Sequence, residues 1–279
     1  MPIVSSNSSG SNYKKANQIK FSHEILFKSG LKIKENSKNP TKINFVNSIM
    51  KTKKFICIFA MSIALSACSQ TKINSVNDKK INYFALGDSY TICEGANTEE
   101  SWPVILCKNL TEKGIAIELI ANPAKTGYTT QNLIDIELPL FETSEVDFTT
   151  LCIGVNDWVQ KVDTGTFHKN LIFILDKVQN HISDKSKIIL LSIPDFSATP
   201  NGGKYSGGRD ISKGLSEFND IIFAEAKKRN IKTVDLFEVS KGMKDDASLV
   251  AADGLHPSAK EYALWEKLIL PVAEELLKK

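Results

Sequence analysis

The chain has 279 residues, of which 42% are hydrophobic and 24% are charged, so it can bury a substantial core. Residues 1–49 contain eight Lys and two acidic residues, and residues 50–80 contain six Lys and one Asp, so the formal net charge of +3 leaves −8 for residues 81–279. An acidic body lacks the surplus of basic side chains that neutralises phosphates, which excludes a nucleic-acid-binding role from our expectations.

The first 49 residues are rich in Asn, Ser and Lys and show little periodic apolar pattern. The signal-like stretch described next would begin a protein, so we expect Met50 to be the true start and residues 1–49 to come from an over-extended reading frame. If residues 1–49 are translated, their composition cannot form a packed core, and they are expected to be a disordered leader.

The stretch MKTKKFICIFAMSIALSACSQ begins at Met50 with three Lys and continues into an apolar run over residues 55–65. This is the layout of a secretory signal, and the run is too short to span a membrane comfortably. The sequence LSAC that ends at Cys68 resembles the lipobox of bacterial lipoproteins. The resemblance implies a signal peptide over 50–67, a lipid on Cys68, a tether over 68–80 and anchoring to a membrane of the cell envelope. A plain signal peptide or a short buried helix stays open.

Five cysteines occur in the chain, and Cys57 and Cys68 fall within this N-terminal segment. The remaining Cys93, Cys107 and Cys152 are odd in number and show no CxxC spacing. We therefore expect neither a disulfide framework nor a metal site.

From Ile81 onward, apolar strand patterns alternate with amphipathic helical patterns. Because alternating strands and helices form a parallel sheet covered on both faces, the pattern predicts an α/β fold for the domain over 81–279. The glycine-rich residues 201–210, NGGKYSGGRD, are expected to form a loop beside the fourth strand. Strands are expected at 81–86, 115–121, 148–154, 187–193 and 232–237, and helices at 100–113, 128–138, 165–181, 211–230 and from about 257 to 278.

Polar residues follow the predicted strands at four places. The first strand ends in Gly-Asp-Ser at 87–89, and the second is followed by residues 122–127. The third leads into Gly-Val-Asn-Asp at 154–157, and Asp-Gly-Leu-His at 253–256 follows the last strand. Because the carboxyl ends of parallel strands share one edge of a sheet, we expect these side chains to converge.

Together they supply the groups that acyl transfer needs. His256 can activate the Ser89 hydroxyl as a general base, and Asp253, three residues earlier, can orient the imidazole. The backbone N–H groups of Ser89 and Gly127 and the side-chain amide of Asn156 can stabilise an oxyanion. The alternative role for Ser89 is that of an N-cap for the following helix.

GDSY, KTGYTT, GVND and DGLH resemble, in this order, the sequence blocks of the SGNH/GDSL hydrolases. The resemblance implies a three-layer α/β/α sandwich with a flavodoxin-like five-stranded parallel sheet. It also implies a triad of Ser89, Asp253 and His256 and an oxyanion hole of Ser89, Gly127 and Asn156. The implied activity is hydrolysis of carboxylic esters, of the lysophospholipase or acyl-esterase type, on a small-molecule, lipid or glycan ester.

No cofactor or metal is implied, and we expect a monomer. A carbohydrate O-acetylesterase, an O-acyltransferase and a non-catalytic binding lipoprotein stay open as alternatives. One departure concerns Cys93, which stands where the family often has glycine. Its thiol would lie either at the rim of the active site or buried as a small apolar group.

Overall fold

The computed structural model describes residues 80–278. The predictions for the leader, the signal peptide, the tether and Cys68 therefore lie outside the described residues. None of the helices within 80–278 is long and apolar enough to cross a membrane.

Five parallel strands form one sheet in the order β2-β1-β3-β4-β5. This order is the flavodoxin-like one, so the predicted five-stranded parallel sheet is confirmed. The strands are β1 (Ile81–Gly87), β2 (Ile117–Ala121), β3 (Phe148–Cys152), β4 (Ile188–Leu191) and β5 (Lys232–Val234).

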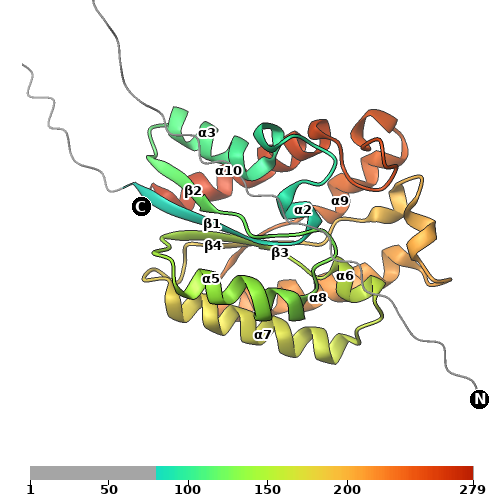
Figure 1. Cartoon of the computed structure of the whole chain (residues 1–279), viewed down its shortest axis with the longest axis horizontal. Coiled ribbons are helices and arrows are strands. Elements are labelled where there is room, and N and C mark those ends of the chain that lie inside the picture. The colour runs from blue at the N-terminus through green and yellow to red at the C-terminus, as the bar shows by residue number, and fades with distance from the viewer. Residues whose placement is uncertain (1–79, 279) are drawn as a thin grey trace, which may run out of the picture. The chain divides into compact units, whose positions relative to one another are not determined.

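Helices cover the sheet on both faces, as Figure 1 shows. α3 (Trp102–Glu112) and α10 (Ala259–Leu277) pack together on one face. The other face carries α5 (Leu138–Glu142), α7 (Thr164–His181) and α8 (Ile211–Arg229). The predicted three-layer α/β/α sandwich is therefore confirmed.

The burial of each strand follows from its place in the sheet. β3 and β4 are buried at every residue because helices cover both of their faces. The sequence of β4, IILL, is entirely apolar, and in β3, FTTLC, the hydroxyls of the two buried threonines are hydrogen-bonded. β2 lies at an edge, and its buried or partly buried residues alternate with exposed ones. Between the layers, the rings of Phe84 from β1 and Phe141 from α5 pack edge to face, with 5.2 Å between their centroids.

Short elements depart from the predicted boundaries. The single helix expected over 128–138 is α4 (Thr130–Asn132), a π-helical turn (Leu133–Glu137) and α5, which extends to Glu142. β5 ends at Val234 rather than 237 because the Ser192 hydroxyl accepts the backbone N–H groups of Leu236 and Phe237 and turns the chain. Three further short helices are α2 (Ser89–Ile92), α6 (Val155–Val159) and α9 (Phe237–Ser240).

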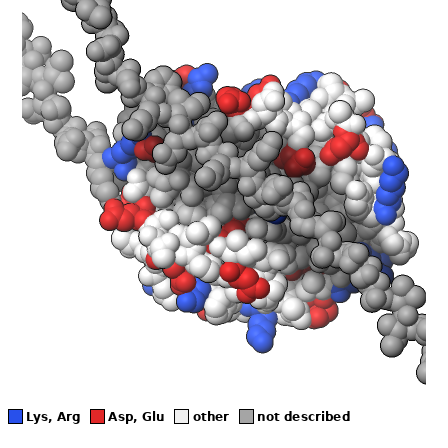
Figure 2. Space-filling model, in the orientation of Figure 1, with Lys and Arg blue, Asp and Glu red and all other residues white. Residues whose placement is uncertain are grey.

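Charged side chains of both signs are interspersed on the face of the described residues shown in Figure 2. Several pair across elements, such as Lys80 with Glu118 at 2.7 Å and Lys177 with Glu142 at 2.8 Å. Exposed pairs of this kind contribute about 0–1 kcal/mol each. The free energy of folding therefore comes chiefly from the buried layers.

The strand order also determines where a ligand can enter. From β1 the chain crosses to β2 on one side, and it then returns past β1 to β3 on the other. The crevice at the carboxyl ends of β1 and β3 is thus the topological switch point, where open α/β sheets bind ligands. Ser89 follows β1 directly and Asn156 follows β3, so both stand at this crevice.

Candidate active site

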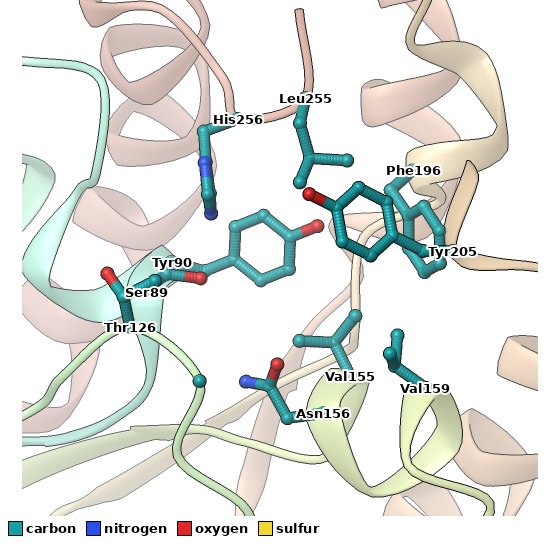
Figure 3. A pocket seen from close by; sticks show the side chains of 11 residues that line it. Ser89, Tyr90, Thr126, Val155, Asn156, Val159, Phe196, Tyr205, Leu255 and His256 are labelled. Carbon is teal, nitrogen blue, oxygen red and sulfur yellow. The ribbon is translucent and has the colours of Figure 1, made fainter. Parts of the chain in front are cut away.

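A pocket of about 210 Å³ opens at the carboxyl ends of β1 and β3. Every site residue predicted from the sequence within 80–278, except Asp253, lines it. His256 and Asn156 point into it from opposite sides (Figure 3). Its lining residues are Ser89, Tyr90, Thr126, Gly127, Val155, Asn156, Val159, Phe196, Tyr205, Leu255 and His256.

Ser89 is the first residue of α2 and does not cap it. The N-cap is Asp88, whose carboxylate Oδ1 accepts the backbone N–H of Tyr90 at 3.0 Å. The interpretation of Ser89 as a helix cap is therefore wrong. Within residues 80–278 the Ser89 hydroxyl makes no hydrogen bond, which leaves it available for chemistry.

The turn that presents Ser89 requires glycine at position 87. The chain bends there from β1 into α2, and a Cβ at this position would lie 2.1 Å from Thr91 Oγ1 and 2.3 Å from the Cys152 carbonyl oxygen. No other residue fits this close approach. The Gly87 N–H donates to the buried Glu137 carboxylate at 3.0 Å, which anchors the turn from below.

Asp253 and His256 form a hydrogen-bonded pair in the turn before α10. His256 Nδ1 lies 2.6 Å from Asp253 Oδ2, while Asp253 Oδ1 accepts the backbone N–H groups of Leu255 and His256. Burial acts to raise the pKa of the Asp253 carboxyl, but these hydrogen bonds outweigh it and lower the pKa below its ordinary value. An ionised carboxylate only accepts, so the proton is on Nδ1 and Nε2 is left free as a base.

Ser89 and His256 line the same pocket, yet no hydrogen bond joins them among the described residues. Bonds between a nucleophile and its base are often long before substrate binds and tighten in the complex. The Tyr90 ring helps to place the imidazole, since it packs edge-on against His256 with 6.2 Å between centroids. Tyr90 is itself packed edge-on against the Trp265 ring of α10 at 5.7 Å.

Three hydrogen-bond donors surround the pocket. Asn156 donates one amide hydrogen to the Tyr128 carbonyl oxygen at 2.9 Å, which fixes the side chain and leaves its second hydrogen free. Within the described part of the chain, the backbone N–H groups of Ser89 and Gly127 donate no hydrogen bond. The three residues predicted to supply oxyanion donors thus line one pocket, and each has a hydrogen that is not used in another hydrogen bond among the described residues.

Asp157 is a residue whose importance the sequence did not reveal. Its buried carboxylate accepts both the backbone N–H and the hydroxyl of Thr130, and Asn170 in turn donates to that hydroxyl. Burial raises the pKa of Asp157, and the bonds from Thr130 counter that effect. Asn156 and Asp157 therefore both hold residues 127–130 against α6, which positions Gly127 relative to Asn156.

Two buried carboxyl groups lie at the turn that presents Ser89. Burial raises the pKa of Asp88 and that of Glu137 to about 8 each, and the negative charge of Asp88 adds to the shift of Glu137. Asp88 Oδ2 and Glu137 Oε1 have no hydrogen-bond partner among the residues that the structure describes. Both groups hold a proton at neutral pH to a large extent.

Burial decides between the two positions considered for the Cys93 thiol. Cys93 is 1% exposed, and its thiol contacts the carbonyl oxygens of Tyr90 and Thr91, so it is a packed residue and not a rim thiol. Burial raises the pKa of Cys93 well above its ordinary value. Within residues 80–278, no three His, Cys, Asp or Glu side chains are grouped as metal ligands.

Comparison with known proteins agrees with this geometry. Residues 85–264 match the model of the GDSL-like lipase/acylhydrolase family. A multidomain esterase from Ruminococcus flavefaciens is 31% identical over 132 residues, which cover 47% of this chain and 16% of that protein. The chain thus spans only a minor part of that relative's length.

Two solved structures illustrate the likeness of fold. TesA superposes with a TM-score of 0.56 at 21% identity, over 70% of this chain and 99% of that one. Axe2, an acetylxylan esterase from Geobacillus stearothermophilus, superposes with a TM-score of 0.55 at 18% identity, over 68% of this chain and 93% of that one. At such identities the superpositions show a shared fold.

Proposed function

The chain belongs to the GDSL-like lipase/acylhydrolase family and is a hydrolase of the esterase class, and from that premise we propose that it cleaves short-chain carboxylic esters through a covalent acyl-enzyme. The observation that carries the proposal is one pocket lined by Ser89, His256 and Asn156, with Asp253 bonded to the imidazole behind it.

In the first step, the Ser89 oxygen forms a bond to the ester carbonyl carbon while His256 Nε2 takes the hydroxyl proton. Asp253 keeps Nδ1 protonated and stabilises the imidazolium. The carbonyl oxygen becomes an oxyanion, which the N–H groups of Ser89 and Gly127 and the free hydrogen of Asn156 receive. Each such donor lowers the barrier by about 2.7–4 kcal/mol.

The second half of the reaction regenerates the enzyme. The bond between the carbonyl carbon and the alcohol oxygen breaks, and His256 gives its proton to the departing alcohol. A water molecule then attacks the acyl-enzyme and transfers a proton to Nε2. The bond to Ser89 breaks, the carboxylic acid leaves, and the hydroxyl is restored.

The size and lining of the pocket support a short acyl group. At about 210 Å³ it is smaller than the roughly 300–1,000 Å³ typical of sites for drug-sized ligands. Its far wall is apolar, formed by Val155, Val159, Phe196, Tyr205 and Leu255. Short acyl esters, including acetylated carbohydrates, therefore rank ahead of lysophospholipids as substrates.

The test is hydrolysis of p-nitrophenyl esters from acetate to palmitate by the purified protein and its Ser89→Ala variant. We expect the highest kcat/KM with the shortest chains and a loss of about 10⁴-fold or more in Ser89→Ala. Intact-protein mass spectrometry after acid quench should show one added acyl group on the wild type alone. Ser186→Ala, at an exposed serine before β4, is the matched control and should retain full activity.

Two outcomes would contradict the proposal. If wild type and Ser89→Ala were equally inert with every ester, a non-catalytic binding role would take its place. If adding an alcohol diverted most of the acyl group into a new ester, the protein would be an O-acyltransferase that uses the same Ser89 intermediate.

A further inference from the structure

Residues 201–210 contain η4, the 3-10 turn over Gly202–Tyr205, and lead to the start of α8. We call these residues the strap. They are rich in glycine, and the catalytic steps described above use none of them. Nevertheless, the strap is bonded to both halves of the candidate active site and places one aromatic ring on the pocket.

The first end of the strap is bonded to the turn that carries the acid–base pair. The Asn201 backbone N–H donates to the Gly254 carbonyl oxygen at 2.8 Å, and its side-chain amide donates to the Asp253 carbonyl oxygen at 2.6 Å. Gly254 fits tightly here, since a Cβ on it would lie 2.7 Å from the Asn201 amide nitrogen. The strap therefore begins in fixed register with Asp253 and His256.

The second end is bonded to α6, the helix that carries Asn156. The Arg209 guanidinium lies over the Trp158 ring, 3.8 Å from its centroid, and donates to the carbonyl oxygens of Trp158 at 2.7 Å and Val159 at 3.2 Å. The last carbonyls of a helix lack partners within the helix, and a cation at this end also complements the helix dipole. Arg209 thus closes the strap onto α6.

Tyr205 lies between these two attachments and forms the outer wall of the pocket. Figure 3 shows its ring beside Phe196 and Leu255, on the opposite side of the pocket from Ser89 and Thr126. Tyr205 is 45% exposed and also lines the pocket, so it stands between the pocket and the solvent on that side. Because the strap is bonded at both ends, the backbone that carries Tyr205 cannot move away from the pocket without breaking the bonds of Asn201 or Arg209.

We propose that Tyr205 determines substrate specificity by limiting the length of the acyl chain. This inference rests on the proposed function, in which the acyl group occupies the apolar part of the pocket. The carbonyl carbon is held at Ser89, its oxygen at the donors of Gly127 and Asn156, and the alcohol beside His256. The acyl chain then runs toward the apolar wall and meets the ring of Tyr205.

The experiment measures kcat/KM for p-nitrophenyl acetate, butyrate, hexanoate and octanoate with wild type, Tyr205→Ala, Tyr205→Phe and Lys204→Ala. Removing the ring should raise the octanoate-to-acetate ratio of kcat/KM by about 10-fold or more, in line with the effect of a few methylenes in an apolar pocket. Tyr205→Phe keeps the ring and should retain the wild-type ratio. Lys204 is exposed and does not line the pocket, so Lys204→Ala should leave every rate unchanged.

A control experiment tests whether Tyr205 affects the alcohol part of the ester instead. It compares p-nitrophenyl acetate with β-naphthyl acetate, which differ only in the leaving group. The inference is overturned if Tyr205→Ala leaves the chain-length ratio unchanged. It is also overturned if the variant alters preference among alcohols instead, or if Tyr205→Phe shifts the ratio as far as Tyr205→Ala. These failures require an active, Ser89-dependent wild type, whereas failure of the proposed function would appear as an inert wild type across the whole series.

Discussion

Asn156 has two amide hydrogens, and the structure uses one of them to hold the side chain in place. The bond to the Tyr128 carbonyl oxygen fixes the amide plane, so the second hydrogen has a defined direction before substrate arrives. Such preorganisation is what makes an oxyanion donor effective, because the reaction then requires no reorientation of dipoles. The role assigned to Asn156 can be tested through the rate of turnover.

Asn156→Ala should lower kcat for p-nitrophenyl acetate by about 10²–10³-fold, with a much smaller change in KM, because the donor acts chiefly in the transition state. Steady-state kinetics at saturating ester measures this. Gln160→Ala is the matched control, since this exposed amide lies one turn further along, does not line the pocket and, within residues 80–278, makes one side-chain hydrogen bond, to the Gly127 carbonyl oxygen at 3.4 Å. Equal losses of kcat in the two variants would contradict the assignment of Asn156 to the oxyanion hole.

The sequence was enough to predict those site residues that have both a suitable functional group and an informative position in the chain. Ser89 and Asn156 follow strand ends and carry polar groups, so topology placed them at one edge of the sheet, whereas His256 was predicted from the acid three residues before it. The walls formed by Tyr90 and Tyr205 could not be found in this way. An aromatic residue is as common in a core as in a pocket, and only tertiary packing distinguishes the two.

The helical segment over residues 130–142 anchors the turn between β1 and α2 through the buried acid Glu137. The Glu137 carboxylate accepts the Gly87 N–H, and burial raises its pKa to about 8. In the unfolded chain the pKa of a glutamate is about 4.3. Between these two values the folded state binds more protons than the unfolded state, so the free energy of unfolding falls as pH rises.

Glu137→Gln should therefore stabilise the protein at high pH. The amide oxygen can still accept the Gly87 N–H, but the side chain no longer titrates. Because each pKa unit corresponds to about 1.4 kcal/mol, the variant's melting temperature should exceed that of wild type by several degrees at pH 8–9 and by much less at pH 5. Asp88 lies nearby with a similarly raised pKa, so part of the pH dependence remains.

Thermal unfolding followed by circular dichroism at pH 5, 7 and 9 measures this difference. Glu142→Gln is the control, since this carboxylate is exposed and pairs with Lys177 on the surface. A melting-temperature difference between Glu137→Gln and wild type that stayed constant with pH would show that Glu137 does not titrate between its folded and unfolded values as stated.

Two neighbouring glycines of η4 allow the packing of the strap to be tested with a matched pair of substitutions. A Cβ on Gly202 would lie 2.1 Å from the Phe196 carbonyl oxygen, a backbone atom that cannot move aside, whereas a Cβ on Gly203 meets nothing within 4 Å. Gly202→Ala should cost about 1–3 kcal/mol, while Gly203→Ala should be neutral or slightly stabilising. The melting temperatures of the two variants measure this difference in stability. Equal melting temperatures would mean that Gly202 does not pack against the Phe196 carbonyl oxygen as described.

Helices were predicted correctly where the periodic pattern of apolar residues extends over enough residues to be recognised. The long helices α7, α8 and α10 match their predicted ranges within one or two residues. The short helices α2 and α6 comprise four and five residues, less than two turns, so they show no helical period of their own. Their positions depend on bonds from distant residues, such as those of Arg209 to α6, which a local pattern does not contain.

At the scale of the whole molecule, we propose that the protein is exported and held at a membrane through a lipid on Cys68. The support is the sequence from Met50, whose basic residues, apolar run and LSAC ending resemble a lipoprotein signal. Expressed from Met50 in bacteria with labelled palmitate, the protein should carry the label and sediment with membranes. Cys68→Ala should lose the label, and Cys57→Ala, within the apolar run, should keep it. Label retained by Cys68→Ala would contradict the proposal.

The order of the elements along the chain also affects how fast the candidate active site forms during folding. Ser89 follows β1, whereas His256 precedes α10, so the site joins residues from opposite ends of the described domain. Contacts between such distant stretches close slowly during folding, while local helices form early. On refolding from denaturant, catalytic competence should return with the slowest phase, when α10 docks and Trp265 reaches the Tyr90 ring. A chain still short of that step would be compact and helical, yet unable to cleave an ester.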